Sequence, residues 1–150
     1  GTLAVVAPQD EDGTTGAVIG PDVAVEIILD TSGSMRQRFG GERRIDIAKR
    51  VLADLIRRDL PAGLPVAMRT FVRERRSCDT ELAVPLGPLD PAALASQVEG
   101  LRILGSVRTP LAKAIRAVAD DLQGVAGPRI VIVVSDGAES CGGDPSRRIG

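Results

Sequence analysis

The sequence predicts an α/β protein with a doubly wound, Rossmann-like, mostly parallel sheet flanked by helices. Two nearly continuous apolar runs, residues 23–29 (VAVEIIL) and 129–134 (RIVIVV), have the composition of strands that are covered on both faces. Between these runs lie a segment with helical periodicity, then two segments of strand type, then further helical segments. This order is typical of helices layered on a parallel sheet.

The N-terminal stretch, residues 1–21, joins a short apolar run at residues 3–7 to a polar, glycine-containing segment, PQDEDGTTG. We expect it to be a lead-in strand, or the end of a neighbouring domain, followed by a linker. The domain itself is then expected at residues 22–150. Its first strand, residues 23–29, contains one charged residue, Glu26, which requires a partner or solvent at that position.

A helix is predicted at residues 44–60, where apolar residues recur at steps of three and four, and Pro61 ends it. Residues 66–72 and 81–86 are two predicted strands separated by the polar stretch RERRSCDT, which indicates a hairpin with a charged tip.

Two further helices are indicated by their starts. Asp90 followed by Pro91 opens a short helix that ends near Gly100, and Thr109 followed by Pro110 opens a helix that ends by Gly124. The strand at 129–134 follows. A free-standing fold that ends near this strand would leave its edge open, so we expect the fold to be incomplete at its C-terminus or to be completed by another chain.

Composition excludes several classes of function. The 19 basic and 20 acidic side chains give a formal net charge of -1, which argues against binding to nucleic acid. No apolar run has the length of about 20 residues that a membrane-spanning helix needs. The two cysteines, Cys78 and Cys141, lack the spacing of a zinc site and are compatible with one bridge or with two free thiols.

The residues whose side chains could bind a ligand or take part in chemistry follow the two buried strands. Asp30 ends the first strand and Asp136 follows the second, so both carboxylates are expected at the rim formed by the carboxyl ends of the parallel strands. Ser32 and Ser34 come directly after Asp30, and Thr109 opens the helix that leads to the second strand. These five side chains form an all-oxygen set, which suits Mg²⁺, or alternatively Mn²⁺ or Ca²⁺.

The hydroxyl groups give this predicted site its character. Serine and threonine are neutral donors, so a bound cation keeps positive charge and attracts a further anionic ligand. Each residue alone is also compatible with an ordinary role: Asp30, Ser32 and Ser34 in a turn, Thr109 as a helix cap, and Asp136 before Gly137 in a turn. Their joint placement at matching strand and helix ends favours the metal site.

Three segments resemble the metal-ion-dependent adhesion site of von Willebrand factor A-type domains. They are residues 30–35 (DTSGSM), residues 108–111 around Thr109, and residues 135–137 (SDG), within a resemblance that spans about residues 23–144. The stretches ESCGGDP and CDTELAVPLGPLDP are similar to bacterial members of the family. The resemblance implies that Ser32, Ser34 and Thr109 contact the metal directly or through water, while Asp30 and Asp136 act largely through water and hydrogen bonds.

The predicted hairpin tip would lie at the same rim if its first strand runs parallel to residues 23–29. Arg73, Arg75 and Arg76 would then help to grip an acidic ligand, and a solvated loop is the alternative. A bridge between Cys78 and Cys141 is geometrically compatible with this arrangement.

The sequence therefore predicts a non-enzymatic module that presents a divalent metal to an exposed Asp or Glu of a protein partner. One alternative is a Mg²⁺-dependent phosphotransfer enzyme that uses Asp30, although no second acid stands at position 32. A Ser-His-Asp triad is excluded because the chain has no histidine. Another alternative, suggested by the resemblance, is an assembly subunit of a chelatase-like ATPase complex. The chain has no phosphate-binding Gly-Lys-Ser/Thr loop, so that ATPase would be another polypeptide.

Overall fold

The computed structural model describes residues 4–6, 23–71, 77–102, 109–135 and 141. Five strands form one sheet in the order β1-β7-β2-β5-β6. Strands β2 (Ala24–Leu29), β5 (Pro65–Phe71) and β7 (Arg129–Ser135) run parallel, while β1 (Ala4–Val6) and β6 (Thr80–Pro88) pair antiparallel at the two ends of the order. The predicted class, a mostly parallel sheet flanked by helices, is confirmed.

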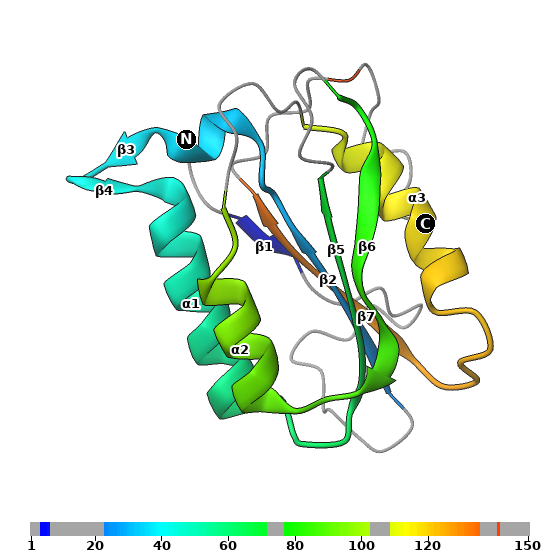
Figure 1. Ribbon diagram of the computed structural model, residues 1–150. Helices are drawn as coiled ribbons and strands as arrows, with labels where there is room; N and C mark the ends of the chain where they lie inside the picture. The colour runs from blue at the N-terminus through cyan, green and yellow to red at the C-terminus, as the bar shows by residue number, and fades with distance from the viewer. Residues whose placement is uncertain (1–3, 7–22, 72–76, 103–108, 136–140, 142–150) are drawn as a thin grey trace.

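Helices cover both faces of this sheet (Figure 1). On one face lie α1 (Arg44–Asp59) and α2 (Pro91–Glu99), and on the other lies α3 (Leu111–Asp121). Strand β2 is buried along its whole length, and its side chains alternate between two apolar clusters. Val25, Ile27 and Leu29 belong to the cluster beneath α1 and α2, while Ala24 and Ile28 belong to the cluster beneath α3. The near-continuous apolar composition of this strand follows from that double coverage.

The two predicted hairpin strands correspond to β5 and β6, which pair antiparallel with register shifts near Met68. The helix predicted at residues 44–60 is α1, and its buried residues include Ile45, Ala48 and Leu52. Helix α2 begins as predicted, because the Asp90 carboxylate accepts a hydrogen bond from Ala93 N at 3.2 Å.

One expectation needs correction. The strand β7 does not have an open edge, because β1 pairs with it from Ala4 opposite Ser135 to Val6 opposite Val133. Helix α3 begins at Leu111, directly after Thr109 and Pro110, as predicted. Two short features were not predicted: the 3-10 helix η1 (Gly33–Arg36), and the hairpin of β3 (Arg38–Phe39) and β4 (Glu42–Arg43).

The missed hairpin has a clear signal in the sequence. Gly40 and Gly41 have φ angles of 62° and 92°, a left-handed conformation that glycine adopts without steric cost. The division into a lead-in at residues 1–21 and a domain at residues 22–150 stays a prediction, although β1 belongs to the same sheet as β2.

Candidate functional site

The polar side chains that follow β2 are held by strand β7 and by their own turn. Asp30 N donates to Val134 O at 2.9 Å, which extends the pairing of β2 with β7 by one residue. The Asp30 carboxylate, fully buried, accepts hydrogen bonds from Ser32 N at 2.9 Å and from Ser135 Oγ at 2.6 Å. Both carboxylate oxygens are thus oriented by donors from two different segments.

Ser32 and Ser34 lie side by side directly after this carboxylate. Their hydroxyl oxygens are 3.1 Å apart, and Ser32 is only 1% exposed. Ser32 occupies the N-cap position of η1, yet its side chain makes no capping hydrogen bond. The two hydroxyl groups therefore face each other instead of closing the end of a helix.

The neighbouring strand ties this turn to the sheet. Thr31 Oγ1 accepts a hydrogen bond from Phe71 N at 3.1 Å and donates to Phe71 O at 3.4 Å. Because Phe71 is the last residue of β5, this pair of bonds fixes the end of β2 against the end of β5. Sequence reasoning missed both Thr31 and Ser135. A hydroxyl residue at each of two buried strand ends was the available signal.

Thr109 lies at the same end of the sheet. It is 3% exposed and stands two residues before α3. An ion pair of 2.6 Å between Lys113 on α3 and Asp79, just before β6, places the start of this helix beside the end of the antiparallel β5–β6 pair.

Asp136 and the three arginines Arg73, Arg75 and Arg76 lie outside the described residues. Within the described part of the chain there is no group of three or more His, Cys, Asp or Glu residues that would hold a metal ion. The structure therefore brings together Asp30, Ser32 and Ser34, and it places Thr109 at the same rim.

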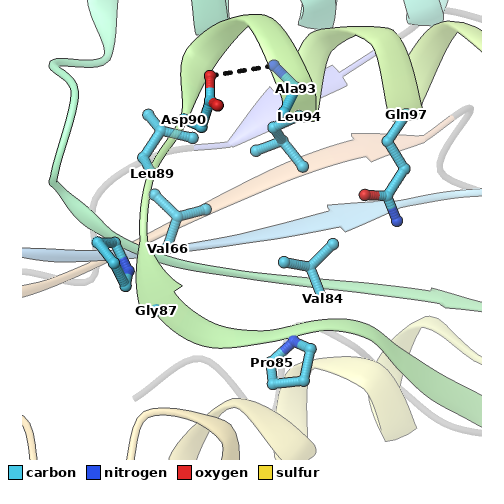
Figure 2. A pocket seen from close by; sticks show the side chains of 10 residues that line it. Val66, Val84, Pro85, Gly87, Leu89, Asp90, Ala93, Leu94 and Gln97 are labelled. Carbon is cyan, nitrogen blue, oxygen red and sulfur yellow. Dashed lines mark hydrogen bonds between the residues drawn. The ribbon is translucent and has the colours of Figure 1, made fainter.

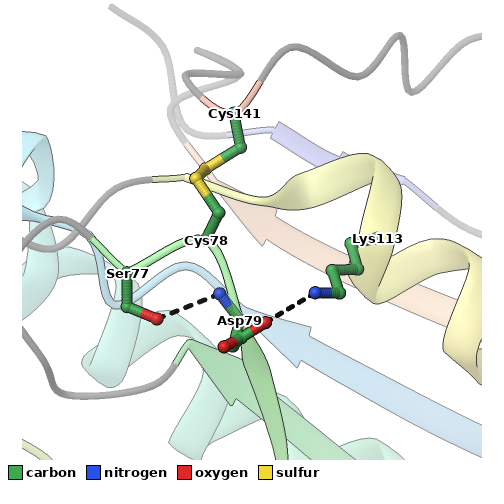
Figure 3. The surroundings of a disulfide bond; sticks show 5 residues. All are labelled: Ser77, Cys78, Asp79, Lys113 and Cys141. Carbon is green, nitrogen blue, oxygen red and sulfur yellow. Dashed lines mark hydrogen bonds and ion pairs between the residues drawn. A yellow bond between two sulfur atoms is a disulfide. The ribbon is translucent and has the colours of Figure 1, made fainter.

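Cys78 and Cys141 form a disulfide with a Cα–Cα distance of 5.7 Å (Figure 3). Cys78 precedes β6, and Cys141 follows β7 by six residues. The bond thus joins Cys141, beyond the end of β7, to Cys78, before the start of β6. Strands β2 and β5 lie between β7 and β6 in the strand order.

A second feature, at the opposite end of the sheet, is an apolar hollow of about 200 Å³ between β6 and α2 (Figure 2). Val66, Val84, Pro85, Leu89 and Leu94 contribute to its lining. Its one acidic side chain, Asp90, is engaged in capping α2. The hollow has no converging polar groups and does not resemble a catalytic site.

The doubly wound sheet and the aspartate-serine turn at the carboxyl end of its central strand, β2, define the class of α/β domain. The chain belongs to the von Willebrand factor type A domain family, whose model matches residues 25–139.

Two relatives are uncharacterized proteins of Bacillus subtilis. YwmD is 32% identical over 139 residues, covering 85% of this chain and 61% of that protein, and YwmC is 28% identical over 136 residues, covering 81% and 57%. The chain thus spans about three fifths of the length of these relatives.

A solved structure shares the fold. It is the crystal structure of an aerotolerance-related membrane protein from Bacteroides fragilis with multiple mutations to serines, at a TM-score of 0.53 and 23% identity, covering 70% of this chain and 49% of that one. None of the helices described here is long and apolar enough to cross a membrane.

Proposed function

We propose that this domain binds a protein partner through a divalent metal ion, preferably Mg²⁺, held at the rim beyond β2. The observation that carries the proposal is the turn after β2, where the Ser32 and Ser34 hydroxyls lie 3.1 Å apart beside the buried carboxylate of Asp30. The metal would be held by Asp30, Ser32, Ser34, Thr109 and Asp136, an oxygen-only set that suits a hard cation.

The donor set favours a role in binding an external ligand over a metal site that protein carboxylates close completely. Two aspartates and three hydroxyls leave a divalent ion more positively charged than a larger cluster of carboxylates would. When the aspartates act through water and hydrogen bonds, the cation stays electrophilic toward an external carboxylate. An exposed Asp or Glu of a partner protein is the ligand that completes this coordination.

Two observations favour this proposal over ordinary structural roles. Ser32 does not cap η1 with its side chain. Asp30 does form a turn with Ser32 N, but its other oxygen accepts from Ser135, a residue distant in sequence. The phosphotransfer alternative is the weaker one, because position 32, where such enzymes usually carry a second acid, is a serine.

The first test is direct binding of Mg²⁺, measured by isothermal titration calorimetry on the chelator-treated protein. We expect saturable binding with one site, and a loss of at least about tenfold in affinity for Asp30→Ala and for Ser32→Ala, because each removes a group that holds the ion. Ser96→Ala, which changes an exposed serine on α2, is the matched control and is expected to bind as the wild type does.

Two results would argue against the proposal. Equal Mg²⁺ affinity in Asp30→Ala and wild type would show that the metal does not bind at this rim. Mg²⁺-dependent turnover of a generic phosphoester by the wild type, lost in Asp30→Ala, would replace the binding role with phosphotransfer.

A further inference from the structure

A positively charged pocket lies between the N-terminal half of α1 and the segment that follows α2. Its hollow measures about 320 Å³ and is lined by Arg43, Ile45, Lys49, Leu101 and Arg102. We call this hollow the cationic pocket. Three of these lining residues, Arg43, Lys49 and Arg102, are basic.

The charges in the cationic pocket are incompletely balanced. Arg43 pairs with Asp46 at 3.1 Å, and Lys49 Nζ donates a hydrogen bond to the carbonyl oxygen of Leu101. Arg102 is exposed, and within the described ranges no acidic side chain pairs with it. Of the three cations named here, Arg43 is thus the one that forms an ion pair with a carboxylate.

The position of Lys49 reflects this imbalance. Burial lowers the pKa of its amine, Asp46 acts in the opposite direction, and the nearby charges of Arg43 and Arg102 lower it further. Like charges held around one hollow repel each other, and a bound anion removes that cost. Two guanidinium groups and an ammonium also provide donors suited to a carboxylate.

Acidic residues near the pocket restrict how a ligand approaches. Asp54 and Glu99 border a neighbouring hollow that shares Lys49. Glu99 is engaged with Arg57 at 2.7 Å, and Glu42 with Arg50 at 2.6 Å. A negatively charged ligand is therefore expected to enter from the side of Arg43 and Arg102.

The cationic pocket is connected to the rim beyond β2 through the start of α1. Arg43 is the N-cap residue of α1, and Arg44 N donates to Gln37 O at 2.8 Å, which fixes the start of α1 against the end of η1. The helix η1 directly follows Ser32. Arg102 stands seven residues before Thr109 along the chain. Figure 1 shows residues 101–102 rising along α1 toward the end where that helix begins.

We infer that the cationic pocket binds a second acidic side chain of the same protein partner whose first carboxylate the metal holds. This inference rests on the proposed function and adds a second contact to it. The two contacts together select a partner segment with several acidic residues, because a single Asp or Glu satisfies only one of them. A carboxylate that pairs with Arg102 and Lys49 needs no metal, so the second contact can be measured alone.

The test uses fluorescently labelled hexaglutamate in buffer with EDTA and about 20 mM salt, with binding followed by fluorescence anisotropy. We expect saturable binding that weakens strongly in 0.5 M NaCl, since exposed charges are screened there. Arg102→Ala and Lys49→Met are each expected to lower the affinity at least about fivefold. Arg58→Ala, which removes an exposed arginine of α1 outside the pocket, is the matched control and is expected to leave binding unchanged.

The outcomes separate this inference from the proposed function. Absence of binding in EDTA, or equal affinity for Arg102→Ala and wild type, overturns the cationic pocket whatever Mg²⁺ does. Displacement of hexaglutamate by equimolar inorganic phosphate overturns an acidic peptide as the ligand. Binding in EDTA that Asp30→Ala retains and Arg102→Ala loses supports the pocket, even if Mg²⁺ binding fails and the proposed function falls.

Discussion

Two buried carboxyl groups on the same strand have opposite surroundings. Asp30, at the end of β2, receives hydrogen bonds from Ser32 N and Ser135 Oγ, which suit a charged carboxylate. Glu26, in the middle of β2, is equally inaccessible, yet neither of its oxygens has a hydrogen-bond partner of ordinary geometry among the described residues. Its nearest cation, Arg69 Nε, is 3.9 Å away.

Arg69 forms hydrogen bonds with Asp121 and not with Glu26. Its guanidinium makes two hydrogen bonds to Asp121 on α3, at 2.5 Å and 2.7 Å. Burial, followed by the adjacent Asp121, raises the pKa of Glu26 to about 9, while Arg69 acts in the opposite direction. The pKa of Asp121 is lowered, with burial opposing and Arg69 providing the principal stabilisation of its charge. Glu26 is therefore neutral at pH 7, and Asp121 carries the charge that pairs with Arg69.

This assignment predicts how Glu26 affects stability. Its folded pKa of about 9 lies above the ordinary glutamate pKa of 4.5, so the folded state binds more protons between these values and stability falls as pH rises through that window. Glu26→Gln removes the titration and keeps the shape. We expect it to be more stable than wild type at pH 8, on the order of 1–3 kcal/mol, with the difference vanishing near pH 4.5.

Urea unfolding at pH 5, 6.5 and 8 measures the effect, with Glu81→Gln on the exposed surface of β6 as control. A Glu26→Gln variant that is less stable than wild type at pH 8 would show instead that Glu26 is ionised in the folded state.

At the scale of elements, the disulfide is a covalent link between two parts of the fold that are distant in sequence. Strand β7 ends at Ser135, and Cys141 is bonded to Cys78 just before β6 (Figure 3). The neighbouring Asp79 pairs with Lys113 on α3, so the hairpin, the start of α3 and the segment after β7 meet at one corner of the molecule. Asp136, which lies between Ser135 and Cys141 in sequence, belongs to the chain that this bond closes.

Removal of the disulfide is expected to destabilise the fold substantially. The cysteines are 63 residues apart, and closing a loop of this length restricts the unfolded chain by on the order of 4 kcal/mol. The double variant Cys78→Ser/Cys141→Ser should show a lower urea midpoint than the wild type. Reducing agent should lower the wild-type midpoint to a similar value and leave the variant unchanged. Identical midpoints for oxidised and reduced wild type would contradict this prediction.

At the scale of the whole molecule, stability is expected to be graded across the sheet. Strands β2 and β7 have a hydrogen-bonded neighbour on each side, whereas β6 pairs only with β5 among the strands that the structure describes. Pro85 and Pro88 lie in β6, and proline protects such an edge from pairing with other chains because it offers no N–H group. The proposed metal rim therefore stands on the most deeply enclosed strands of the fold.

Hydrogen exchange followed by NMR tests this gradient. We expect the amides of β2 to exchange at the rate set by global unfolding, and those of β6 to exchange at least about tenfold faster through local opening. The amides of β2 that bond to β5 and those that bond to β7 should be protected equally well, because both neighbours lie inside the sheet, and the two sets serve as internal controls. Equal protection of β2 and β6 would mean that the sheet opens only as a unit.

The sequence by itself determined the α/β class, most helices and strands, and the placement of Asp30, Ser32 and Ser34 at a strand end. These features depend on local patterns: apolar runs such as residues 23–29, helical periodicity in residues 44–60, and the Asp90–Pro91 helix start. The same patterns indicated the end of the sheet at which polar residues gather, since parallel strands deliver their carboxyl ends to one rim.

Tertiary structure alone decided which groups meet. The partnership of Arg69 with Asp121, the support of Asp30 by Ser135, and the bond between Cys78 and Cys141 each join segments far apart in the chain. The pairing of β1 with β7, opposite to the expected open edge, is of the same kind. A local pattern specifies the conformation of a segment, but its neighbours are selected by the burial and hydrogen bonding of the whole chain, so these contacts have no signature in any single stretch of sequence.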